Sequence, residues 1–322
     1  MLHQEISSNS NIAHILRFVD SCVLYCFTWR DPISYLEDFL TSFKRFEPEN
    51  YQLLILLKIG GRKELMDNIM TIVEAKSLQS LKIIECEDIG FDIATFINTM
   101  KNENHEIFVW ITASSEITRK TWLSELTLPI QRGESFVCGS MASNESLSSG
   151  IFQRLSDSAE KRMLKVFNKG KFLSSYSFLN QTVIFFRAAL AVTYCLIHPI
   201  RILRYIILFP SFPNPHLRTT GIAIQKSFFE TLDVKTPYRR IPTLAFESGK
   251  RSISILSNIG MKHPLVVVHN GYSSLSDLAA KETFRSKSLY LPPVIDRHFK
   301  IYLKANPYEA RKQEFLSWRT KK

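Results

Sequence analysis

The strongest constraint on the fold is an apolar run at residues 107–111, Ile-Phe-Val-Trp-Ile, in which polar and apolar residues do not alternate. A strand of this composition is covered on both faces, as in the parallel sheet of an α/β protein. The run leads into Thr112-Ala113-Ser114-Ser115-Glu116. Because ligands of open α/β sheets bind outside the carboxyl ends of the strands, we expect Thr112, Ser114 and Glu116 to meet a polar ligand.

The segments before this strand repeat one pattern, in which a short apolar run is followed by apolar residues at helical spacing. Runs at 23–27, 53–57 and 81–84 predict strands, and the first following helix is expected to start with Asp31 as N-cap and Pro32. Such alternation is typical of an α/β fold with a doubly wound, mostly parallel sheet and helices on both faces. Further strands are predicted at 136–139, 221–224 and 264–269, and further helices at 121–128, at 226–232 and from a cap at Ser248 to Gly260.

The balance of charge points to an anionic partner. The chain of 322 residues carries a formal net charge of +11, and 45% of its residues are hydrophobic, which is enough for a substantial core. Nucleic acid, an acidic membrane surface and a phosphorylated ligand are all compatible with this charge, as is a merely solvated basic surface. We expect no nucleic acid partner, because no motif for base stacking or groove reading accompanies the charge.

The cysteines and the first residues bear on the compartment. The five cysteines are an odd number and are widely spread, which predicts buried thiols in a reducing compartment. Residues 1–11 are polar and show no apolar segment of a secretory signal. The prediction is a cytoplasmic protein, peripheral on the inner face of the plasma membrane if one of its segments binds lipid.

One segment, residues 182–209, is strongly apolar but is interrupted by Arg187, His198, Pro199, Arg201 and Arg204. No window offers the ~20 uncharged residues of a transmembrane helix. The segment is therefore predicted either to lie in the plane of an anionic membrane as a basic amphipathic helix or to form a helical hairpin packed on the domain.

Four runs carry a resemblance to a known family. They are Gly-Glu-Ser-Phe-Val-Cys-Gly-Ser-Met-Ala-Ser-Asn-Glu-Ser at 133–146, the run 209–224 with its Asn-Pro-His-x-Arg-Thr motif, Phe-Glu-Ser-Gly-Lys-Arg-Ser-Ile-Ser at 246–254, and Thr283-Phe284-Arg285. Together with the sheet pattern they resemble bacterial glycosyltransferases of the GT-A fold and the inverting, family-two kind, associated with surface polysaccharide biosynthesis.

The resemblance implies a fold, an activity and a division of the chain. The fold would be GT-A-like with a helical apolar and basic insertion, and the activity would be sugar transfer from a nucleotide-sugar donor to a polysaccharide or lipid-linked glycan acceptor. Residues 1–20 would be a lead-in, 21–150 the nucleotide-sugar-binding half, 151–212 a polar loop with the insertion, and 213–322 the acceptor and catalytic half with the tail.

The donor is then expected at the end of the first strand and at an aspartate after the third. Thr28, Arg30 and Asp92 match those positions, and a carboxylate suits the task because it accepts two hydrogen bonds from base or ribose. The alternative for Asp92 is a purely structural role, as an acid in the first turn of a helix.

The sequence departs from the family where the family holds a divalent metal. The usual Asp-x-Asp is replaced by Thr112-Ala113-Ser114, so a tightly held Mg²⁺ or Mn²⁺ is not predicted, although Glu116 could be a lone ligand. Either cationic side chains replace the metal against the donor phosphates, or catalysis is lost. The residues available for the first option are His216, Arg218, His269 and Arg285.

Inverting transfer requires a base, and the resemblance implies Glu247, just before a helix of the second half. Relatives often have Glu-Asp with the second acid as base, whereas here Ser248 follows. Glu247 as a salt-bridged acid near a helix N-cap, and His269 as a structural histidine, are the alternatives. The function predicted first is a glycosyltransferase; the alternative is a non-catalytic homologue that binds a sugar nucleotide or a glycan.

Overall fold

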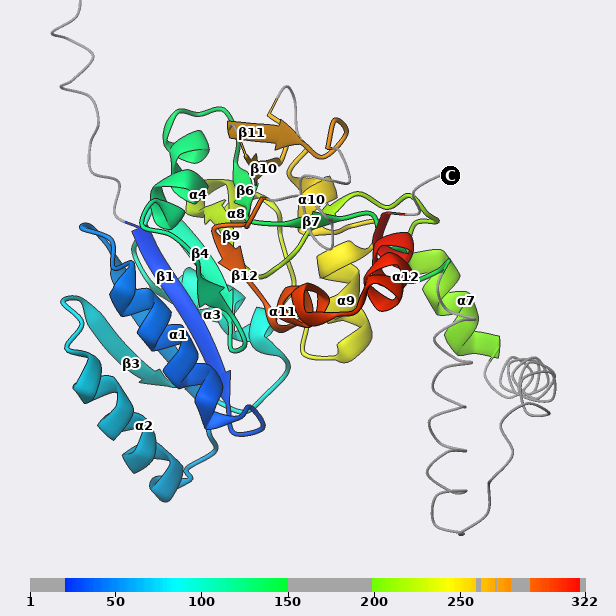
Figure 1. The fold of residues 1–322 in the computed structure, drawn as a ribbon. Coiled ribbons are helices and arrows are strands. Elements are labelled where there is room, and N and C mark those ends of the chain that lie inside the picture. The colour runs from blue at the N-terminus through cyan, green and yellow to red at the C-terminus, as the bar shows by residue number, and fades with distance from the viewer. Residues whose placement is uncertain (1–20, 150–198, 259–261, 270, 279–289, 319–322) are drawn as a thin grey trace, which may run out of the picture.

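A computed structural model describes residues 21–149, 199–258, 262–269, 271–278 and 290–318. Its centre is an eight-stranded sheet with the order β11-β10-β6-β9-β4-β1-β2-β3 (Figure 1). The strands are β1 (Ser21–Thr28), β2 (Gln52–Lys58), β3 (Leu81–Glu85), β4 (Ile107–Thr112), β6 (Val137–Gly139), β9 (Ile222–Gln225), β10 (Leu265–Val268) and β11 (Gly271–Ser274).

Most neighbours in this sheet are parallel. Strand β1 pairs in parallel with β2 and β4, β2 with β3, and β10 with β6. Strand β9 is antiparallel to both β4 and β6, and β11 is antiparallel to β10. The predicted doubly wound, mostly parallel sheet is confirmed.

Helices cover both faces, as predicted. Alternate residues of β1 explain why, because Val23, Tyr25 and Phe27 point into one core and Leu24 and Cys26 into the other. The first core is completed by α1 (Ile33–Arg45), α2 (Lys63–Lys76) and α4 (Trp122–Gln131). The second is completed by α3 (Asp92–Asn102), α8 (Lys226–Thr231), α9 (Arg240–Ser248) and α10 (Ile253–Leu256).

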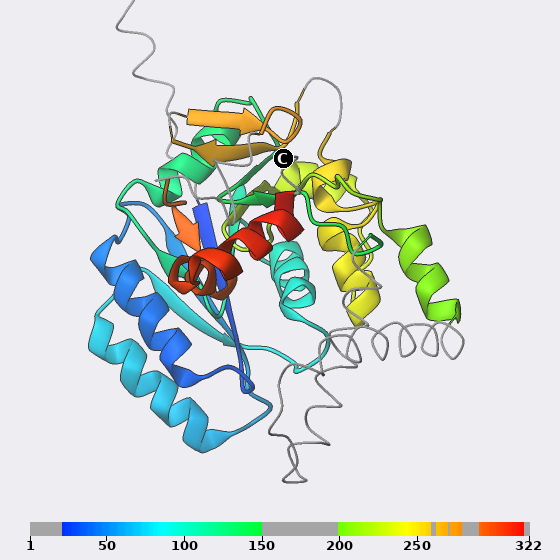
Figure 2. The same cartoon turned by 45° about the vertical axis from the view of Figure 1, so that its right-hand side comes forward.

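Smaller elements line the carboxyl edge of the sheet. Two short pairs, β5 (Glu116–Ile117) with β12 (Val294–Ile295) and β7 (Ala142–Ser143) with β8 (His216–Leu217), are both antiparallel. Helices α11 (Arg297–Lys304) and α12 (Pro307–Trp318) follow β12, while α7 (Pro199–Leu208) stands at the margin of the molecule in two views (Figures 1 and 2). None of the helices within the described ranges has the length and apolarity needed to cross a bilayer.

The division of the chain is only partly visible. Residues 1–20, and 151–198 of the predicted loop and insertion, lie outside the described residues, and of the apolar segment only 199–209 is described. Strand β9, from the second predicted half, lies between β4 and β6 of the first. The two halves therefore share one sheet, and the predicted boundaries stay a prediction.

The predicted helix with a cap at Ser248 was wrong. Ser248 is the last residue of α9, and the next helix, α10, is capped instead by Ser252, whose Oγ accepts the N–H of Ile255. The side chain of Asn214 donates to the carbonyl of Ser248 at 2.7 Å, which satisfies one of the free carbonyls at the end of α9. This tertiary contact is not visible in the local sequence.

The predicted N-cap at Asp31 was also wrong. Pro32 occupies the N-cap position of α1 without a side-chain cap. The Asp31 carboxylate accepts instead from the backbone N–H and the hydroxyl of Thr28, at 2.9 and 2.8 Å, and so closes the turn after β1.

One glycine allows the chain to cross the edge of the sheet before β9. Gly221 has a φ of +68°, donates its N–H to the carbonyl of Trp110 and accepts from the N–H of Ser140. A Cβ at this position would lie 2.8 Å from the Cβ atoms of both Ser140 and Val294. Gly221 therefore allows residues 218–220 to lie against the end of β4.

We expect Gly221→Ala to destabilise the protein strongly. A left-handed φ alone costs roughly 1–2 kcal/mol for a residue with a Cβ, and the two close contacts add to that cost. The control is Gly61→Ala, because Gly61 has a φ of +71° but no atom within 4 Å of its added Cβ. Denaturant unfolding of both variants measures the difference, and equal losses of stability would contradict the close approach at Gly221.

Candidate functional site

A buried ion pair lies at the carboxyl edge of the sheet. Nη2 of Arg218 is 2.8 Å from Oδ2 of Asp296, whose side chain is only 5% exposed, and Nη1 of Arg218 is 3.9 Å from Oε2 of Glu145. Burial raises the pKa of Asp296, but the charge of Arg218 and the N–H of Phe299 outweigh it and hold this pKa below its ordinary value. Asp296 is thus ionised, and it also caps the start of α11.

Glu247 lies beside this pair, in the last turn of α9 and not before a helix as predicted. Its Oε1 accepts a hydrogen bond of 2.8 Å from the hydroxyl of Thr219. Burial and then the charge of Asp92 raise the pKa of Glu247 to about 7, against the opposing effects of Thr219 and Arg218. A carboxyl group with this pKa exchanges protons near neutral pH, which suits a general base.

Asp92 shares the same electrostatic environment. It is the first residue of α3, and burial raises its pKa, while the N–H of Ile93 and the charge of Lys58 act in the opposite direction. The negative charge of Asp31 raises it further, so the end of β1 lies near Asp92. We name Arg218, Glu145, Asp296, Glu247 and Asp92 the Arg218 cluster.

Three of the runs that carry the family resemblance meet at this cluster. Glu145 comes from residues 133–146, Arg218 from 209–224 and Glu247 from 246–254. Further contacts join the runs, because the N–H of Leu217 donates to Ser254 Oγ at 2.8 Å and β7 pairs with β8. The fourth run, with Arg285, lies outside the described residues.

The polar residues after β4 lie next to the cluster. The hydroxyl of Thr112 is 2.6 Å from that of Thr220 and 3.1 Å from that of Ser115. The hydroxyl of Ser114 accepts from the N–H of Arg297 at 3.4 Å. Since Arg297 directly follows Asp296, this hydrogen bond places the end of β4 beside Asp296, the ion-pair partner of Arg218.

These residues do not fit a divalent metal. Glu116, the acid nearest the family position, has its Oε1 2.6 Å from Nζ of Lys300, and the hydroxyl of Thr112 is shared with two neighbours. Among the residues that the structure describes, no group of three or more His, Cys, Asp or Glu side chains is placed to hold a metal ion. Hard cations require several oxygen ligands, and the residues that follow β4 offer one carboxylate, Glu116, which is already paired with Lys300.

The side chain of His216 is buried and uncharged. Its Nδ1 lies 2.7 Å from the carbonyl oxygen of Asn214, and since a carbonyl only accepts, Nδ1 carries the hydrogen. Burial lowers the pKa of His216 to about 4. The imidazole is therefore neutral at physiological pH in these surroundings, and its predicted contact with a diphosphate stays a prediction.

The end of β1 forms the rim of the site. The indole N–H of Trp29 donates to Asp88 at 2.7 Å, and the guanidinium of Arg30 lies 3.7 Å from the same carboxylate and 4.7 Å from the Trp29 ring centre. The hydroxyl of Thr28 is engaged with Asp31. Thr28 and Arg30 therefore belong to the turn after β1, where the Arg30 side chain is 64% exposed and lies beside Asp88.

The structure does not bring His269 to the Arg218 cluster. His269 lines a separate cavity of about 530 Å³ with Arg119, Glu125, Tyr272 and Tyr290. Its ring contacts that of Tyr290 edge-on, and Arg119 is bound to Glu125 and Tyr290. His269 follows β10, several strands from β4, which explains the separation.

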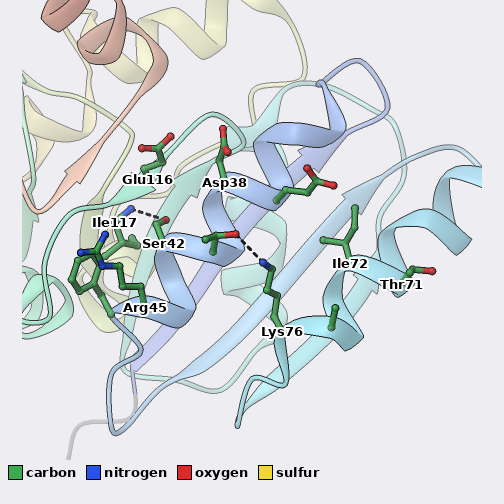
Figure 3. Close-up of a pocket in the computed structure, with 12 residues that line it drawn as sticks. Asp38, Ser42, Arg45, Thr71, Ile72, Lys76, Glu116 and Ile117 are labelled. Carbon is green, nitrogen blue, oxygen red and sulfur yellow. Dashed lines mark hydrogen bonds between the residues drawn. The ribbon is translucent and has the colours of Figure 1, made fainter.

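A larger cavity than the one at His269 also lies away from the Arg218 cluster. It measures about 680 Å³ and lies between α1, α2 and β5, where Lys76 donates to Thr41 and the N–H of Ile117 donates to Ser42 (Figure 3). Of the predicted site residues it contains Glu116 alone. Volume by itself does not identify the site in this protein.

Sequence reasoning missed several residues that shape the cluster: Lys58, Glu145, Thr219 and Asp296. Lys58 is buried at the end of β2 and donates to the carbonyls of Ile89 and Gly90, at 3.1 and 2.8 Å. A single cation at the end of an apolar strand was an available signal. Asp296 was recognisable as an acid before a helix, but its partner Arg218 is 78 positions away.

We expect Arg218→Met to cost roughly 3–5 kcal/mol of unfolding free energy, because it leaves the buried carboxylate of Asp296 without its partner. The matched control is Arg132→Met, which breaks an exposed pair with Glu134 at 3.9 Å and should cost less than about 1 kcal/mol. Urea unfolding of both variants makes the comparison. A small loss for Arg218→Met would show that the pair is dispensable.

No protein-family model matches this sequence, and no curated protein matches it. Solved structures show partial likeness. GalNAc-T7 with UDP, GalNAc and Mn²⁺ has 17% identity and a TM-score of 0.32, over 38% of this chain and 22% of that one. The mannosyltransferase PcManGT from Pyrobaculum calidifontis with GDP-Man and Mn²⁺ has 9% identity and a TM-score of 0.33, over 37% of this chain and 34% of that one.

The structure of S. aureus TarS 1-349 has 13% identity and a TM-score of 0.31, over 37% of this chain and 34% of that one. The chain thus spans between 22% and 34% of the length of the three structures.

Proposed function

We propose that the chain is a glycosyltransferase that moves a sugar from a nucleotide-sugar donor to a hydroxyl of a polysaccharide or lipid-linked glycan, with inversion at the anomeric carbon. The observation that carries the proposal is Glu247, with a pKa of about 7, hydrogen-bonded to Thr219 and lying beside Arg218. A single well-placed base is what inverting transfer needs from a protein, since it deprotonates the attacking hydroxyl.

The other roles follow from position. Thr28, Arg30 and Asp92 are proposed to hold the base and ribose, and Thr112 and Ser114 to donate hydrogen bonds to the phosphates. Arg218, and Arg285 outside the described residues, are the proposed cations for the leaving diphosphate. Glu116, His216 and His269 are engaged elsewhere or uncharged, so we assign them no charge-neutralising part.

The metal is not part of the proposed chemistry, because the residues at the end of β4 do not fit one. This departure also motivates the second candidate function, a non-catalytic homologue that binds a sugar nucleotide or glycan. The two differ in whether bound donor is consumed. We place either protein at the inner face of the plasma membrane, on the strength of the net charge of +11 and of the basic apolar segment.

We expect Glu247→Gln to reduce sugar transfer by about 100-fold or more, the usual contribution of a general base. Donor affinity, read by thermal shift over a panel of nucleotide sugars, should persist because Gln keeps the shape of the side chain. The assays are run with EDTA, and Glu230→Gln, an exposed acid on α8, is the control. Wild-type protein that binds donors without consuming any would support the non-catalytic alternative.

Stability provides an independent readout of the same variant. Because folding raises the pKa of Glu247, the protonated side chain favours the folded state, and that contribution is lost as pH rises through about 7. Glutamine carries no charge at any pH. Above pH 7 the Glu247→Gln variant should therefore melt at a higher temperature than the wild type, which shows at the same time that it is folded.

A second prediction concerns the pH profile. Thr219→Val removes a hydrogen bond that stabilises the charged form of Glu247, so the pKa of Glu247 should rise above its value of about 7. The ascending limb of transfer rate against pH should move to higher pH. Thr236→Val, which alters a half-buried threonine whose hydroxyl donates to Asn98 and not to Glu247, should leave the limb in place. If the ascending limb of the pH profile does not move in the Thr219→Val variant, the base is a group other than Glu247.

A further inference from the structure

Helix α7 presents apolar side chains to solvent. Ile200, Leu203, Ile206 and Ile207 are 69%, 56%, 50% and 56% exposed, while Ile202 is buried at 9%. At 100° per residue these four lie within an arc of about 120° on the helix, opposite the Tyr205 ring that stacks on Phe209, and the buried Ile202 lies just beyond one end of that arc. We name the four exposed residues the outer face of α7. Large apolar side chains that are exposed together on one face, and not scattered singly, mark a contact surface.

The charges around this face are positive. Arg204 is exposed on α7, and Lys250 and Arg251 are exposed just beyond α9. The N–H of Lys250 donates to the carbonyl of Leu208 at 2.9 Å, so these cations lie near the end of α7. The sequence has no aspartate or glutamate from residue 199 to 218. A second copy of this face would meet like charges, whereas anionic lipid headgroups complement it.

The length of α7 indicates how it would meet a bilayer. Ten residues rise about 15 Å, half of the ~30 Å thickness of a hydrocarbon core. The helix is therefore too short to span, and an interfacial helix instead lies in the plane, with apolar residues among the acyl chains and cations at the headgroups.

The two residues that follow α7, Phe209 and Pro210, attach it to the domain next to the Arg218 cluster. Phe209 is buried, and the carbonyl of Pro210 accepts hydrogen bonds from Ser146 and Ser148, at 2.6 and 2.7 Å. Ser146 directly follows Glu145 of the cluster, and Lys250 is three residues after Glu247. A surface bound through α7 is thus held close to the carboxylate that we assign as base.

We propose that the outer face of α7 rests in the headgroup region of an anionic bilayer and presents the Arg218 cluster to an acceptor carried on a membrane lipid. The second part rests on the proposed function and selects the lipid-linked acceptor over a free polysaccharide. The first part, binding to the bilayer, does not depend on catalysis.

Membrane binding is tested with the full chain and no donor, by co-sedimentation with phosphatidylglycerol or phosphatidylcholine vesicles. We expect binding to the former that weakens with salt. The double variant Leu203→Gln, Ile207→Gln should bind about tenfold or more weakly, because two apolar side chains no longer leave water. The control, Ile301→Gln, Leu303→Gln, changes residues of α11 that are 46% and 57% exposed and should bind like the wild type.

Three results would overturn the membrane contact: no binding to phosphatidylglycerol vesicles, equal binding by the α7 variant, or a dimer in solution that the α7 variant dissociates. The last would show that a second copy covers the face. Unchanged melting temperatures confirm that both variants fold, since all four positions are exposed.

The acceptor class is tested by transfer to a monosaccharide on a polyprenyl diphosphate, either in phosphatidylglycerol vesicles or on a short water-soluble chain. The wild type should favour the vesicle form by about tenfold, and the α7 variant should lose that preference but keep its rate on the soluble form. Equal wild-type rates on both forms would refute the lipid-linked acceptor. No transfer to either form would refute the proposed function together with the proposed acceptor. The membrane contact would not be affected, because vesicle binding is measured separately.

Discussion

The close approach at Gly221 is the constraint on which the candidate site depends. The chain enters the middle of the sheet here, between β4 and β6, and its backbone touches Trp110 on one side and Ser140 on the other. Only a residue without a Cβ has room and a favourable φ for this passage. The three residues before it, Arg218 to Thr220, are consequently held over the end of β4, where ligands of α/β sheets bind.

Electrostatics at that edge follow from burial. One cation, Arg218, faces Asp296, Glu145 and Glu247, and the carboxylates respond differently. Asp296 is hydrogen-bonded to Arg218 and stays ionised. For Glu247, the opposing effects of Thr219 and Arg218 do not outweigh burial, and its pKa is raised to about 7. Two acids with different environments thus divide the work, one holding α11 and the arginine in place and the other able to take a proton.

Much of the fold was predictable from the sequence, because a strand that is buried on both faces consists of a continuous run of apolar residues. The predicted strands at 23–27, 53–57 and 81–84 correspond to β1, β2 and β3, each within a residue or two. The helices with clear apolar spacing were found as well. Errors arose at helix ends: the end of α9 at Ser248 and the turn at Asp31 depend on partners that local propensity does not include.

For the site, the sequence by itself determined which residue types are present: no paired acids after β4, one glutamate in the run 246–254, and an arginine after Asn-Pro-His. Tertiary structure alone decided their partners. Thr219 meets Glu247 across 28 positions and Arg218 meets Asp296 across 78, and these contacts, with desolvation, fix which groups are charged. They also made His216 neutral and separated His269, because pKa values and distances depend on packing between elements, which no local pattern encodes.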